Sequence, residues 1–115
     1  MEDRFLQQLK KGVLEMLVLT AICEKATYGY ELLSILREGS GGLFALKEGT
    51  LYPILYRLED DGMIEASWQS STGRTAPKKI YTATELGRQE CQRRKTVWQQ
   101  FEHTVDNFCR EDDAP

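Results

Sequence analysis

One segment near the N-terminus is apolar on both sides of a helix, and it constrains the fold more than any other feature. This segment runs from about Asp3 to Lys25. On one side of the helix, apolar residues recur at i, i+3, i+4, i+7 and i+8: Leu14, Leu17, Val18, Ala21 and Ile22. The opposite side is apolar as well and carries Val13, Met16 and Leu19. A helix that is apolar all round has to be buried. At 115 residues the chain is the size of one domain, so we expect this helix at the centre of a single core.

Two further helices are predicted after a break at residues 26–29. Helical spacing resumes at Tyr30 and stops at the glycine-rich residues 39–42. A third pattern contains Leu51, Leu55 and Leu58 and ends at a glycine. If Thr50 caps this helix, Pro53 falls in its first turn, where its missing N–H is tolerated. If the helix begins at Glu48, Pro53 should bend it.

The second half of the chain predicts a β-hairpin followed by one long helix. Alternation in residues 64–68 and 79–83 indicates two strands joined by a polar, basic connection, and we expect Trp68, in the first strand, to lie in the core. Thr84 caps a final helix with a heptad repeat. From Thr84 to Phe108 this helix spans ~37 Å, more than the rest of the domain can cover.

Composition excludes several classes of protein. The cysteines, three in number, are widely spaced, and His103 is the only histidine, so disulfide frameworks, zinc sites, metal cofactors and a catalytic triad are not expected. A disulfide between subunits through Cys109, or a Cys109–His103 dyad, is a weaker alternative. No segment predicts a membrane span or a signal peptide, and we expect a cytoplasmic protein.

The net charge of the chain is −3, but residues 106–113 hold four acids and one arginine, so the rest of the chain has equal numbers of positive and negative charges.

The order of three helices, a hairpin and a helix is typical of a winged helix-turn-helix, in which the third helix enters the DNA major groove. Particular stretches resemble one family more closely: residues 11–19 (KGVLEMLVL), 28–32 (YGYEL), 48–59 (EGTLYPILYRLE), 61–62 (DG) and 79–87 (KIYTATELG). In these the chain resembles the PadR family of bacterial transcriptional regulators over nearly its whole length. Relatives often carry a small polar cap where this chain has Lys47.

The resemblance implies a mainly α (α+β) fold, a winged helix-turn-helix with a two-stranded wing and a long C-terminal dimerisation helix. We expect residues 1–83 to form the DNA-binding domain, residues 84–109 the dimerisation helix and residues 110–115 a disordered acidic tail. The implied protein is a homodimeric repressor that binds double-stranded DNA at an inverted-repeat operator. Hydroxyl, amine and guanidinium donors suit contacts with phosphates and base edges, and the expected DNA-binding residues are Lys47, Thr50, Tyr52, Tyr56, Arg57, Arg74, Lys78 and Lys79.

Two further sites are expected on the terminal helices. The dimer interface should contain Phe5, Leu9, Trp98, Phe101, Val105 and Phe108, which have no evident partner within the chain. In drug-responsive relatives a tryptophan in the last helix helps to bind flat aromatic compounds between subunits, so the resemblance makes Trp98 an effector-binding residue for a planar aromatic molecule. Trp98 as a plain interface aromatic is the alternative. The acidic pI of about 5.2 leaves open a winged-helix module that binds proteins and no DNA.

Overall fold

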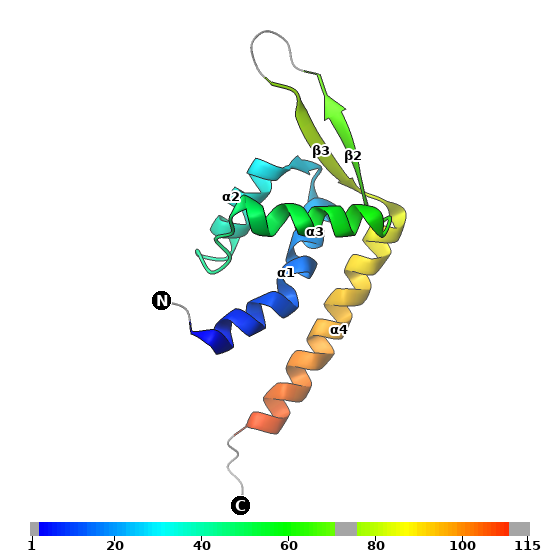
Figure 1. The fold of residues 1–115 in the computed structure, drawn as a ribbon. Coiled ribbons are helices and arrows are strands. Elements are labelled where there is room, and N and C mark those ends of the chain that lie inside the picture. Colours follow the sequence, from blue (N-terminus) through cyan, green and yellow to red (C-terminus); the bar gives the residue numbers. More distant parts are fainter. Residues whose placement is uncertain (1–2, 71–75, 111–115) are drawn as a thin grey trace, which may run out of the picture.

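The computed structural model describes residues 3–70 and 76–110, which form helices and one small sheet (Figure 1). The elements in chain order are α1 (Arg4–Glu24), β1 (Thr27–Tyr28), α2 (Gly29–Gly39), α3 (Glu48–Asp60), β2 (Ile64–Gln69), β3 (Lys78–Ala83) and α4 (Glu85–Cys109). The predicted fold class is confirmed. Within the described residues no helix is both long enough and apolar enough to cross a bilayer.

Helix α1 is the centre of the core, as its sequence predicts. Asp3 caps it by accepting a hydrogen bond from the Leu6 N–H at 2.8 Å. Its buried residues pack with buried residues of α2, α3 and the sheet. Leu51, Leu55 and Leu58, the predicted inner face of α3, are all buried. Burial of these leucines holds α3 against the body and leaves its other face in solvent.

Helix α3 begins at Glu48, so Thr50 is its third residue and not its cap. Lys47 occupies the N-cap position and its side chain makes no capping hydrogen bond. Pro53 therefore lies inside the helix, where it cannot donate to the carbonyl of Gly49. Figure 1 shows α3 as one continuous helix despite this proline. At the other end Gly62, with φ of 76°, stops the helix as predicted.

The sheet has three strands in the order β1-β3-β2, one more than the expected two-stranded wing. Residues Thr27 and Tyr28, which the sequence indicates only as a break between helices, pair antiparallel with Tyr81 and Ile80. Strands β2 and β3 pair over six residues, from Ile64 with Ala83 to Gln69 with Lys78. The added strand fixes the start of α2 to the base of the hairpin.

The prediction that Trp68 lies in the core is wrong. Ile64 is buried and Ala66 is half-buried, but Trp68, with the same parity on β2, is 69% exposed. Alternation along a strand assigns a side chain to a face of the sheet and does not say whether anything covers that face. The hairpin extends beyond the helices (Figure 1), so no helix packs over the face of its outer half.

Helix α4 starts inside the body and then leaves it. Thr84 accepts a hydrogen bond from the Gly87 N–H at 3.0 Å and donates to the Gly62 carbonyl at 2.7 Å, which confirms it as the cap. Gly87 lies so close to Met63 that an added Cβ would overlap the Met63 carbonyl. Cys91 is buried against α1, with its Sγ 3.5 Å from Thr20 Oγ1. Every residue from Thr96 to Arg110 is exposed.

The chain is therefore elongated. Its radius of gyration is 17.0 Å, against about 13 Å for a compact domain of this length. The hairpin and α4 leave the body in opposite directions (Figure 1). Residues 111–115, most of the predicted acidic tail, lie outside the described residues.

Candidate nucleic-acid interface

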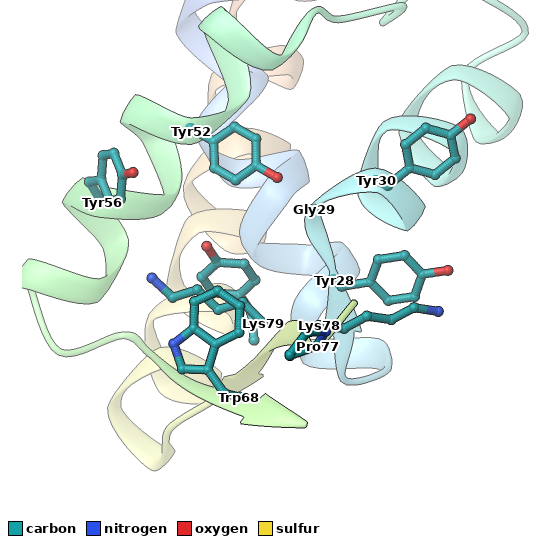
Figure 2. A pocket seen from close by; sticks show the side chains of 10 residues that line it. Tyr28, Gly29, Tyr30, Tyr52, Tyr56, Trp68, Pro77, Lys78 and Lys79 are labelled. Atoms are coloured by element: carbon teal, nitrogen blue, oxygen red, sulfur yellow. The ribbon is translucent and has the colours of Figure 1, made fainter. Parts of the chain in front are cut away.

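A hollow of about 400 Å³ lies between α3, the start of α2 and the hairpin. Five of its residues are those predicted to bind DNA or to lie in the core: Tyr52, Tyr56, Trp68, Lys78 and Lys79. Figure 2 shows the tyrosines reaching in from α3 while the tryptophan and lysines come from the hairpin. The structure thus brings together side chains from elements that are separate in the sequence.

Helical spacing explains the two tyrosines. Tyr52 and Tyr56 are four residues apart and therefore lie on the same flank of α3, the flank that faces the hairpin. Tyr52 is half-buried because its ring packs on Gly29, whereas Tyr56 is exposed. An aromatic wall with hydroxyl groups along its edge results.

Two lysines give the hollow its positive charge. Lys78 Nζ lies 4.4 Å from the centre of the Tyr28 ring. Lys79 Nζ lies 6.0 Å from the Tyr56 ring and 5.7 Å from the Tyr81 ring. These are cation–π distances, so each ammonium group is held at the hollow by an aromatic face.

Tyr81 lies beneath these residues and is almost fully buried. Burial, with a smaller contribution from nearby Tyr52, raises the pKa of Tyr81 to about 12. A phenol is neutral at physiological pH even at its ordinary pKa of about 10, and burial moves the pKa of Tyr81 further from that range.

The N-terminus of α3 lies open beside this hollow. Lys47, Thr50 and the intervening residues are exposed. The first N–H groups of a helix and its dipole attract anions such as phosphate, and the exposed Lys47 ammonium adds to that attraction. Glu48, in the same turn, opposes it.

Arg57 is placed differently from the two tyrosines. It lies on the opposite flank of the exposed face of α3, and its Nε donates to Glu15 Oε1 on α1 at 3.0 Å. The sequence gives no sign of this pair because its members are 42 residues apart. Arg74 lies outside the described residues.

Sequence reasoning named four of the residues that line the hollow and missed six: Tyr28, Gly29, Tyr30, Trp68, Pro77 and Tyr81. Tyr28 and Tyr30 belong to the segment that forms β1 and the start of α2, and Trp68 was expected in the core. Tyr30 is exposed. The available signal was the YGY triplet at residues 28–30, whose two aromatic side chains flank a glycine.

The residues expected at an interface with a second subunit are exposed. On α4 the rings of Trp98 and Phe101 lie 6.4 Å apart, and Phe108 is 90% exposed. On α1 Phe5 and Leu9 are exposed as well. No group of histidine, cysteine or acidic residues that suits a metal ion occurs among residues 3–70 and 76–110.

Comparison with known proteins identifies the family. Residues 18–93 match the transcriptional regulator PadR-like family. An uncharacterised protein of Lysinibacillus sphaericus is 31% identical over 98 residues, which cover 85% of this chain and 89% of that protein. The negative transcriptional regulator PadR of Bacillus subtilis is 32% identical over 78 residues, 68% of this chain and 42% of that protein.

A solved structure agrees with this match. The crystal structure of a PadR-like transcriptional regulator from Bacillus cereus superimposes with a TM-score of 0.78 at 31% identity, covering 91% of this chain and 99% of that one. The matched family is one of transcriptional regulators and not of enzymes. The chain therefore belongs to the PadR-like family and is a DNA-binding transcriptional regulator.

Proposed function

We propose that this regulator is a homodimeric repressor that binds an inverted-repeat operator, with α3 in the major groove and the hairpin on the adjacent backbone. The hollow between α3 and the hairpin is the observation that carries the proposal. It combines fixed ammonium groups, phenol hydroxyls and an open helix N-terminus, and each of these binds phosphate or base edges. The name of the Bacillus subtilis relative, a negative regulator, supports repression.

The proposed contacts divide by position. Thr50, Tyr52 and Tyr56 on α3 face base edges and sugars, and Lys47 holds a phosphate at the start of the helix. Lys78 and Lys79 bind the backbone from β3, Arg74 is proposed to bind it as well, and Trp68 extends the aromatic wall against the same strand. Base contacts determine sequence and phosphate contacts determine position, so the two groups should differ in their effect on discrimination.

A homodimer supplies the second half of an inverted repeat. The exposed apolar stripe of α4, formed by Trp98, Phe101, Val105 and Phe108, is the proposed seam, with Phe5 and Leu9 packing on the partner. Isologous contact of one such stripe with its copy produces a two-fold axis. The same symmetry in the operator follows from the symmetry of the protein.

A planar aromatic effector is proposed to bind between the two subunits beside Trp98. Stacking on a ring contributes roughly 0.5–1.5 kcal/mol beyond area burial. Such a ligand changes DNA affinity only if it favours one separation of the two α3 helices over another. Titration with flat hydrophobic dyes should quench tryptophan emission, and Trp98→Ala should abolish binding while the protein remains a dimer. Unchanged dye affinity in Trp98→Ala would remove Trp98 from the effector site.

The DNA function is tested by gel shift on the region upstream of the gene, at several salt concentrations. The logarithm of the affinity should fall linearly with the logarithm of salt concentration, with a slope of about −0.9 per phosphate contact. Arg74→Ala should weaken all duplexes alike, whereas Thr50→Ala or Tyr52→Ala should lower preference for the operator. No binding at low salt to any duplex would instead favour a protein-interaction module.

A further inference from the structure

The carboxylate of Glu15 contacts two helices at once. On one side Glu15 Oε1 accepts a hydrogen bond from Arg57 Nε of α3 at 3.0 Å. On the other side Glu15 Oε2 lies 3.7 Å from a terminal nitrogen of Arg94 on α4. Glu15 itself belongs to α1, the central helix of the core. A single side chain on α1 thus contacts both α3, the proposed recognition helix, and α4.

The α4 side of this bridge is firmly held. Arg94 Nε also donates to Glu90 Oε1 at 3.0 Å, and Arg93 binds the same carboxylate at 2.7 Å. Arg94 is only 22% exposed and lies near Met63 Sδ as well. Ion pairs with several partners that are partly shielded from water are more constraining than isolated surface pairs.

The α3 side is open to solvent. The Arg57 side chain is 61% exposed, and it reaches from α3 to Glu15 on α1. Packing of Leu51, Leu55 and Leu58 fixes α3 in the body, and a hydrogen bond at the exposed edge of the helix adds a contact that depends on direction. The guanidinium of Arg57 supplies that directional contact.

We infer that Glu15 is a positioning residue that sets the orientation of the recognition helix relative to α4 by holding Arg57 and Arg94 together. The inference rests on the proposed DNA function and assigns Arg57 to the orientation of α3 in place of base contact. Movement of α4 against α1 would reach α3 through this carboxylate. Glu15 is thereby the point where a change in the dimer alters how the operator is bound.

The test compares two duplexes, one selected by the wild-type protein from a randomised pool and one with the same bases permuted. Glu15→Gln keeps the shape of the side chain and removes its charge. Its ratio of affinities for the selected and permuted duplexes should fall by about two- to fivefold, and affinity for the permuted duplex should hardly change. Glu24→Gln is the matched control, since it removes the same charge from an exposed position on the same helix.

A double-variant cycle separates positioning from simple loss of charge. If Glu15 and Arg57 act as a unit, adding Glu15→Gln to the Arg57→Gln variant should lower the ratio of affinities for the selected and permuted duplexes no further. Thermal unfolding establishes that each variant is folded, and Arg94→Gln tests the same bridge from α4 should Glu15→Gln fail to fold.

An unchanged ratio of affinities in Glu15→Gln would overturn the inference while leaving the DNA function intact. If affinity for both duplexes rose equally, so that the ratio stayed the same, Glu15 would only compete with phosphate for Arg57. Failure of the wild-type protein to select any duplex would overturn the DNA function and this inference with it.

Discussion

Gly29 is the residue whose size the interface depends on most directly. A Cβ at this position would lie 2.9 Å from Cζ of Tyr52, so Gly29→Ala should displace the Tyr52 ring and lower the free energy of unfolding by roughly 1–3 kcal/mol. Chemical denaturation measures the loss. Tyr52→Phe removes the phenol oxygen and should restore part of the stability in the double variant. Gly12→Ala is the control for added bulk, because nothing lies near its Cβ; inside a helix this change should raise the free energy of unfolding by up to about 1 kcal/mol. A Gly29→Ala protein as stable as the wild type would contradict the packing described.

The thiols should differ sharply in reactivity. Burial, with a smaller contribution from Cys91, raises the pKa of Cys23 to about 11, so only about one molecule in a thousand carries the reactive thiolate at pH 8. Cys91 is buried and Cys109 is exposed. A disulfide-exchange reagent at pH 8 should therefore react quickly with one thiol per chain. Cys109→Ser should remove that fast phase, and a fast phase that survives would place a second thiol at the surface.

At the scale of elements, the ion-pair cluster within α4 should weaken in acid. Hydrogen bonds from Arg93 and then Arg94 hold the pKa of Glu90 at about 2, below its ordinary 4.5. Because the folded pKa is the lower one, this stabilisation is present above pH 4.5 and is lost as the pH falls towards 2. The Glu90 side chain is only 17% exposed. Denaturation midpoints measured from pH 7 to pH 3 should decline less steeply for Glu90→Gln than for the wild type. Glu102→Gln, exposed on the same helix, should leave the slope unchanged, and an unchanged slope in Glu90→Gln would exclude this contribution.

Most elements were predictable because their signals are local. The cap at Thr84, the stop at Gly62 and the leucine face of α3 depend on residues within a few positions of one another. Strand β1 was not predictable, because two residues form a strand only where β3, more than fifty positions later, offers a partner. The exposure of Trp68 and the pairing of Arg57 with Glu15 likewise depend on contacts across the fold. Tyr52, Tyr56, Lys78 and Lys79 of the candidate interface could be named from sequence, but Tyr28 and Tyr30 were missed, and the meeting of these side chains in one hollow could not be predicted.

At the scale of the whole molecule, the uncovered apolar stripe of α4 predicts a dimer. Sedimentation at micromolar concentration should give twice the chain mass of 13.2 kDa, because burial of large apolar side chains is the main favourable term in association. Phe101→Glu should yield monomers. Asn107→Glu adds the same charge on another side of α4 and should leave the dimer intact. A stable 13.2 kDa particle in the wild type would contradict the proposed seam.

The two halves of α4 differ in how many contacts with the core limit substitution. Its first turns are fixed by Thr84, by Gly87 against the Met63 carbonyl and by Cys91, whereas every residue from Thr96 to Arg110 is exposed. Substitutions in the outer half therefore meet few constraints from the core, while those in the first turns alter the fold. If the outer half binds the proposed partner subunit and effector, its residues can change what is bound there without altering the proposed DNA-binding surface of α3 and the hairpin, so that one such surface can respond to different signals.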